Sequence, residues 1–146
     1  MRQILVDSMM GRLARWLRLL GYDAPLLEKP PLQIKKDQVF LTRRKAWQNK
    51  VGVVFVLHDR LEDQLAQVTK TLGLNYQPQK LFTRCLECNL TVQSVSPSEV
   101  QGLVPEYILH TAESFSQCPG CGRVFWPGTH VDRAEGLLKV IWKNKT

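Results

Sequence analysis

The stretch QILVDSMMGRLARWLRLLG (residues 3–21) joins a short strand pattern to an amphipathic helix pattern. The apolar run at residues 3–6 predicts a β-strand, and residues 8–20 predict a helix with Gly21 placed as its C-cap. At about 100° per residue, the large apolar side chains gather on one face of this helix, with Leu19 as the exception. The opposite face carries three arginines: Arg12, Arg15 and Arg18.

The rest of the first half repeats this alternation of strands and helices, which is typical of a parallel sheet built from βαβ units. The nearly continuous β-branched run at residues 51–57 predicts a strand buried on both faces. Asp59 is placed to cap the next helix, with Glu62 as its capping partner. The remaining expected elements are strands at residues 23–27 and 39–42 and helices at residues 43–49 and 60–72.

Two C-x-x-C pairs, separated by 29 residues, mark the second half of the chain. They consist of Cys85 with Cys88 and Cys118 with Cys121. This doubled spacing is typical of a zinc ribbon, because each pair forms a tight turn that offers two thiolates to one tetrahedral Zn²⁺. Four thiolates leave no open position, so we expect structural and not catalytic Zn²⁺. Two disulfides or a redox motif are the alternatives. His110 and His130 could compete as ligands, but surface or structural roles are favoured for both.

A change of pattern after Pro78 predicts a domain boundary near residue 80. We expect an α/β domain at residues 1–80, a zinc ribbon at residues 81–131 and a C-terminal helical tail at residues 132–146. The apolar side chains of this tail need a surface to cover them, and a partner protein is one candidate for that surface. No apolar run is long enough to span a bilayer, and no signal peptide is seen, so a cytoplasmic protein is the default expectation.

The net charge of +7 lies in the first half, where residues 1–80 hold 14 Lys and Arg against 7 Asp and Glu. Such an excess favours a polyanionic partner, because basic side chains that neutralise phosphates release counterions. Solubility alone is the competing interpretation of this charge.

Two carboxylates are candidates for a catalytic site. Asp7 directly follows the first strand, where it could bind a divalent metal or cap the helix that follows. Asp59 is similarly placed after the fourth strand, although its pairing with Glu62 favours a capping role. At the end of the third strand stands Arg44, which is not an acid.

Four segments together resemble the Mut-seven-C ribonuclease domain family. They are VDSMMGRLARWLRLLGYDA (6–24), FLTRR (40–44), LFTRCLECN (81–89) and VPEYILHTAESFSQCPGCGRVFWPGTH (104–130). The resemblance implies a PIN-like parallel sheet followed by a small zinc ribbon. It also implies cleavage of RNA through Mg²⁺ or Mn²⁺ held by acids at the C-terminal edge of the sheet.

The chain departs from the family pattern at its acids. Asp7 matches the first acidic position and Asp59 lies near the last, whereas Arg44 stands where the family has an acid. The family's acidic helix between the second and third strands is replaced by PLLEKPPLQIKKDQ (25–38). An endoribonuclease with a depleted metal site is therefore one hypothesis, and an inactive module that binds RNA or a ribonucleoprotein is the other. A toxin-type nuclease restrained by a partner protein is a third. In the binding hypothesis the phosphate contacts are Arg12, Arg15, Arg18, Arg43, Arg44 and Lys45.

Overall fold

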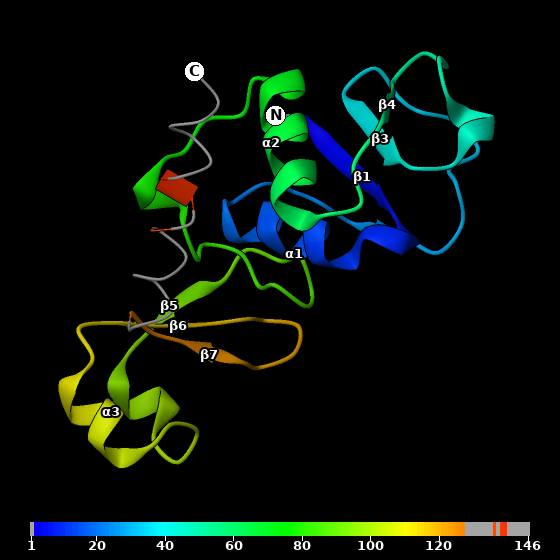
Figure 1. The fold of residues 1–146 in the computed structure, drawn as a ribbon. Coiled ribbons are helices and arrows are strands. Elements are labelled where there is room, and N and C mark those ends of the chain that lie inside the picture. Colours follow the sequence, from blue (N-terminus) through cyan, green and yellow to red (C-terminus); the bar gives the residue numbers. More distant parts are fainter. Residues whose placement is uncertain (1, 128–135, 137, 140–146) are drawn as a thin grey trace.

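The computed structural model describes residues 2–127, 136, 138 and 139, and its first half contains a four-stranded sheet (Figure 1). The strand order is β2-β1-β3-β4, and every neighbouring pair is parallel. The strands are β1 (Gln3–Asp7), β2 (Leu26–Leu27), β3 (Gln38–Thr42) and β4 (Val53–Phe55). The predicted α/β class with a parallel sheet is confirmed.

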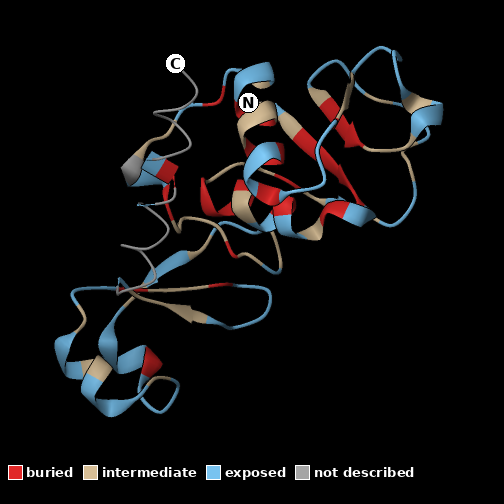
Figure 2. Ribbon diagram, viewed as in Figure 1, coloured by how far each residue is buried: buried red, intermediate tan, exposed pale blue. Residues whose placement is uncertain are grey.

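Two helices pack on one face of this sheet and form the main core. The helices are α1 (Gly11–Leu19), preceded by the 3₁₀ turn η1 (Ser8–Met10), and α2 (Leu61–Leu72). Buried side chains of alternate strand positions, including Ile4 and Leu41, pack with buried leucines of both helices. Figure 2 shows that burial is concentrated in β1, β3, α1 and α2. Burial of this apolar surface is the main term that holds the sheet and helices together.

Gly21 ends α1 through a left-handed turn. The last helical position is capped by Leu20, so the predicted C-cap at Gly21 is wrong by one residue. Gly21 has φ of 95°, its N–H donates to Arg18 O, and the Tyr22 N–H donates to Leu17 O. These are the two hydrogen bonds of a Schellman motif. A Cβ at Gly21 would lie 2.9 Å from Lys80 O, so only glycine fits between the helix and the segment that leads to the cysteines.

Three local predictions in the first half are wrong. The strand β4 is shorter than residues 51–57 and only half-buried, because it is one of the two edge strands of the sheet and has a neighbour on one side only. Residues 43–49 contain only the 3₁₀ turn η2 (Lys45–Trp47). The helix α2 is capped by Arg60 without a side-chain hydrogen bond, so Asp59 and Glu62 do not form the expected capping pair.

The opposite face of the parallel sheet is covered in part by η2. Phe40 is fully buried and alternates with the residues that face the helices, so it points to this second face. The Trp47 ring packs edge-on against Phe40 with 5.3 Å between ring centroids, and the Lys50 ammonium lies 4.6 Å from the Trp47 ring. Asp7 and Thr42 share this orientation at the C-terminal ends of β1 and β3.

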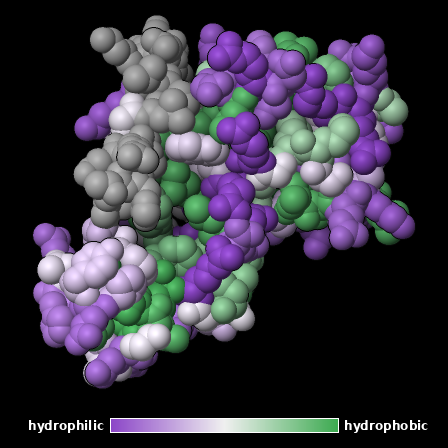
Figure 3. Space-filling model, turned by 60° about the horizontal axis from the view of Figure 1, so that its bottom comes forward, coloured by the Kyte–Doolittle hydropathy of each residue, from purple (hydrophilic) through white to green (hydrophobic). Residues whose placement is uncertain are grey.

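The second half forms a three-stranded antiparallel sheet of order β5-β6-β7. Its strands are β5 (Gln93–Val95), β6 (Phe115–Gln117) and β7 (Val124–Phe125). The 3₁₀ turn η3 (Pro78–Lys80) leads into this half, and η4 (Pro97–Val100) and α3 (Glu106–Thr111) form an insertion between β5 and β6. On the face shown in Figure 3, hydrophobic side chains gather on this smaller lobe. Exposed apolar residues of the insertion are Leu103 and Tyr107.

Most of the predicted tail at residues 132–146 lies outside the described residues, as does His130. Leu138 is described, and its side chain is fully buried in the core formed by the parallel sheet and its helices. At this position the chain itself therefore provides the surface that the apolar tail requires. In the described part of the chain, no helix has the length and apolar character needed to cross a membrane.

Candidate functional site

Asp7 lies at the C-terminal end of β1 and is fully buried. Its Oδ1 accepts a hydrogen bond from the Ser8 N–H at 2.8 Å, and this bond caps the turn η1. Asp7 therefore has the capping role that was one of its two predicted roles. Its Oδ2 accepts from Thr42 Oγ1 at 2.7 Å and from Arg44 Nε at 2.8 Å. Both carboxylate oxygens are thus occupied by protein donors.

Thr42 connects the two charged residues. Parallel pairing of β1 with β3 brings the last residues of both strands to the same edge, where Thr42 donates to Asp7. The Thr42 hydroxyl oxygen also accepts from the Arg44 N–H at 3.0 Å, which fixes the backbone where the side chain of Arg44 begins. Sequence reasoning missed Thr42, although its place at the end of the strand that precedes Arg44 was a usable signal.

Arg44 is held by only one of its side-chain nitrogen atoms. The Nε donates to Asp7, while 40% of the side chain remains exposed. Within the described residues, neither Nη atom of Arg44 makes a hydrogen bond to the protein. The guanidinium therefore has donors directed away from Asp7 that can bind an external anion.

The pKa of Asp7 is below its ordinary value of 3.8. Burial raises this pKa, but hydrogen bonds from Arg44 and Thr42, the charge of Arg44 and the Ser8 N–H together outweigh burial. Asp7 is therefore ionised at neutral pH, and it forms a charge-assisted pair with Arg44.

The other acids of the first half do not join Asp7 in a metal site. Among the described residues, the only group of three or more metal-binding side chains is the cysteine cluster. Asp59 is exposed in the loop after β4, and the structure gives no contact between it and Asp7. Within the described residues, Asp7 therefore belongs to no group of three or more possible metal ligands.

The candidate cations differ in what they contact. Arg12 and Lys45 are exposed, whereas Arg43 donates from Nη1 to the carbonyl oxygens of Val56 and His58. Arg43 therefore links the segment after β3 to the segment after β4. It helps to fix the same sheet edge that carries Arg44.

Arg18 is buried instead of lying on an open basic face. Only 7% of it is exposed, its Nε donates to Ala24 O at 2.9 Å, and its Nη1 donates to Leu86 O at 2.6 Å. Burial lowers its pKa, although nearby Glu87 opposes this effect. The turn of the first cysteine pair thus covers α1 at Arg18, and Leu19 is buried as well. The prediction of one solvent-facing arginine stripe is wrong at this position.

Glu87 adds charged contacts beside the buried Arg18. Its carboxylate pairs with Arg15 and lies 3.8 Å from Arg123, which follows the second cysteine pair. The Arg15 hydrogen bond and charge lower the pKa of Glu87. One acidic residue between the two members of the first pair therefore contacts both α1 and the segment that follows the second pair.

The four cysteine sulfurs all lie within 4.8 Å of one another. In each pair a backbone N–H within the turn donates to the first sulfur: Cys88 N–H to Cys85 Sγ at 3.4 Å, and Gly120 N–H to Cys118 Sγ at 3.3 Å. Such N–H groups stabilise thiolates, which are the form that binds metal. These residues could hold a structural metal such as zinc.

The two cysteine turns have the same backbone design. Asn89 and Gly122 each follow the second cysteine of a pair, with φ of 62° and 77°. Their N–H groups donate to Cys85 O and Cys118 O, both at 3.0 Å. Asn89 also donates from its side chain to Asp23 Oδ1, and its Oδ1 accepts from the Ala24 N–H. This asparagine, which sequence reasoning missed, therefore shapes the turn and attaches it to the first half.

The thiol pKa values reflect four ionisable sulfurs in one small space. The pKa of Cys88 is raised to about 12, chiefly by its hydrogen bond with Cys121, while burial raises the pKa of Cys85. Burial also acts to raise the pKa of Cys118, but N–H groups and neighbouring thiols lower it to about 7. A bound cation would relieve the repulsion among four thiolates, so metal uptake would release protons.

Comparison with protein families gives a match over most of the chain. The model described as Mut7-C RNAse domain matches residues 2–138. Comparisons with curated proteins and with solved structures gave no match.

Proposed function

The chain belongs to the Mut7-C RNAse domain family, and from this we propose that it binds RNA phosphate through Arg44, held by Asp7, instead of cleaving RNA through a divalent metal. The Asp7–Arg44 ion pair is the observation that carries this proposal. An arginine in contact with the carboxylate opposes a divalent cation by its charge and occupies the oxygen that the cation needs.

The unpaired Nη atoms of Arg44 are suited to phosphate. A guanidinium offers planar paired donors that match two phosphate oxygens, and this geometry distinguishes it from an ammonium. Asp7 holds the other side of the group, and Thr42 accepts from the backbone N–H of Arg44, so less conformational freedom is lost when an anion binds. In this proposal Asp7 is a positioning residue.

Neighbouring cations extend the contact beyond one phosphate. Lys45 follows Arg44 and is exposed, and Arg12 is exposed on the helix that follows Asp7. Because the charge excess of the chain lies in residues 1–80, the C-terminal edge of the parallel sheet is the proposed footprint of the RNA backbone.

We further propose that Cys85, Cys88, Cys118 and Cys121 bind one structural Zn²⁺. Zinc supplies folding free energy to small domains of this kind and has no open coordination position when four thiolates bind it. Through Arg18 the metal-bound turns would also stabilise α1, and through Asn89 they would stabilise the segment that follows it.

An endoribonuclease remains the second candidate, because the matched family is described as an RNAse domain. The two candidates differ in one assay. Incubation of single-stranded RNA with the purified protein and Mn²⁺ leaves the RNA intact in our proposal. Cleavage that Asp7→Asn abolishes would overturn it.

The binding proposal is tested by the salt dependence of RNA affinity. Arg44→Gln should weaken binding across sequences and reduce the slope of log affinity against log salt by about 1. Lys70→Gln is the matched control, because Lys70 is exposed in the last turn of α2, away from the proposed footprint. Equal slopes for Arg44→Gln and the unmodified protein would contradict phosphate binding by Arg44.

A further inference from the structure

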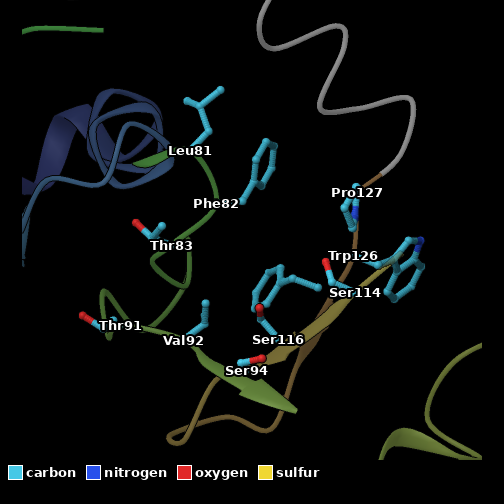
Figure 4. A pocket seen from close by; sticks show the side chains of 11 residues that line it. Leu81, Phe82, Thr83, Thr91, Val92, Ser94, Ser114, Ser116, Trp126 and Pro127 are labelled. Atoms are coloured by element: carbon cyan, nitrogen blue, oxygen red, sulfur yellow. The ribbon is translucent and has the colours of Figure 1, made fainter. Parts of the chain in front are cut away.

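A pocket of about 450 Å³ lies between the segment that follows η3 and the antiparallel sheet (Figure 4). It is separate from the Asp7–Arg44 pair and from the cysteine cluster. The described residues that line it are Leu81, Phe82, Thr83, Thr91, Val92, Ser94, Ser114, Ser116, Phe125, Trp126 and Pro127.

The floor of the pocket is one face of the antiparallel sheet. Ser94 pairs with Ser116, and Ser116 pairs with Phe125, so these three side chains form a row across β5, β6 and β7. Ser114 is two residues before Ser116 and shares this face, whereas Phe115 between them is buried with 2% exposure. Small hydroxyl side chains thus occupy positions where larger ones would fill the space.

Two aromatic residues stand at different walls of the pocket (Figure 4). Trp126 follows β7, and Phe82 belongs to the segment that passes α1. Phe82 has φ of 59°, a conformation that a bulky side chain adopts rarely and at an energetic cost. Its N–H donates to Leu19 O at 3.2 Å, which helps to hold this conformation at the wall of the pocket.

The lining has aromatic and hydroxyl groups but no ionisable side chain among the described residues. Within the described part of the chain, the hydroxyls of Ser94, Ser114 and Ser116 make no hydrogen bond to the protein. A fitting ligand is therefore planar, uncharged and rich in donors and acceptors. A nucleobase has these properties, and proteins bind unstacked bases on aromatic side chains with hydrogen bonds to their edges.

We propose that this pocket binds one unstacked base of single-stranded RNA, against Trp126 and Phe82 and with the serine row at its edge. The choice of ligand class rests on the proposed RNA binding. The pocket would add base contacts to an interface whose cations contact phosphates, so the two sites make different contributions to affinity.

Uridine and adenosine at millimolar concentration are the probes, because neither nucleoside carries a phosphate. We expect each to shift the NMR resonances of the Trp126 indole N–H and of the Ser114 and Ser116 amides. Ser116→Val introduces a residue that is favoured in strands, but it removes the hydroxyl and fills part of the pocket. This substitution should therefore abolish the shifts. Arg44→Gln should leave them unchanged.

An oligonucleotide gives the matched measurement. Trp126→Ala should lower the affinity for an eight-nucleotide single-stranded RNA by about tenfold. The slope of log affinity against log salt should stay unchanged, because the lost contact is uncharged. Tyr107→Ala, which removes a 69% exposed aromatic side chain of α3, is the control and should bind normally. Nucleosides that leave the Trp126 resonance unmoved, or that shift it equally in Ser116→Val, would overturn the base pocket. Such a result would leave phosphate binding by Arg44 untouched.

Discussion

Arg44 donates from Nε to Oδ2 of Asp7 at 2.8 Å, and Asp7 is fully buried while Arg44 is 40% exposed. The pair thus joins a carboxylate that water does not reach to a guanidinium that it does. Each oxygen of the carboxylate accepts a hydrogen bond from the protein. Within the described residues, the two Nη atoms of the guanidinium donate to no protein acceptor. The pair therefore stabilises the buried carboxylate and leaves the guanidinium able to bind an anion.

Replacing Arg44 should destabilise the fold as well as weaken anion binding. Arg44→Gln leaves a buried carboxylate without its cation, and we expect a loss of about 1–3 kcal/mol in the free energy of unfolding. The lower part of this range reflects the exposure of Arg44. Urea denaturation at pH 7 measures the loss, and the double variant Asp7→Asn with Arg44→Gln should recover part of it. Equal losses in the single and double variants would contradict a stabilising pair.

Acid should weaken the fold through Asp7. Because its pKa in the folded protein is lower than its ordinary value of 3.8, Asp7 contributes stability above that pH, and this contribution is lost as the pH falls through the folded pKa. The free energy of unfolding should therefore fall more steeply below about pH 4 in the unmodified protein than in Asp7→Asn. Parallel pH profiles for the two proteins would show that Asp7 is not ionised in the fold.

Arg18 should be structural, in contrast to Arg12 on the same helix. Arg18→Met removes the donors for Ala24 O and Leu86 O, and should cost about 2–4 kcal/mol of stability. Arg12→Met, at an exposed position, should change stability by less than about 0.5 kcal/mol. Thermal unfolding of both variants gives the comparison. Similar unfolding temperatures would mean that the Arg18 contacts do not stabilise the fold.

Metal should be needed for the cysteine-bearing half. Cys85→Ser should lose bound zinc and the hydrogen-exchange protection of β5, β6 and β7, because the cluster joins two turns that flank this sheet. Zinc content by elemental analysis and amide exchange provide the readouts, with Tyr107→Ala as a control that keeps both. Unchanged zinc content and protection in Cys85→Ser would contradict the structural role.

Local patterns predicted the parts of this protein whose structure depends on neighbouring residues. Alternating strand and helix periods predicted the parallel sheet, and doubled cysteine spacing predicted a compact four-sulfur cluster. The position of Asp7 after a strand limited it to a cap or a metal ligand, and the cap is present. In contrast, the burial of β4 depended on the order of the strands in the sheet, and hydrophobic periodicity does not predict that order.

Tertiary structure alone decided which charges are free. Helix periodicity placed Arg12 and Arg18 on one polar face. The cysteine turn that covers Arg18 includes Leu86, which lies 68 residues later in the chain, so helix periodicity could not predict this contact. The register of β1 with β3 likewise decided that Thr42 and Arg44 meet Asp7. Sequence identified Arg44 where the resembled family has an acid, while folding determined that the arginine binds the remaining carboxylate. The physical reason is that a charge acquires its partner from three-dimensional proximity, whereas a strand or helix acquires its period from adjacent residues.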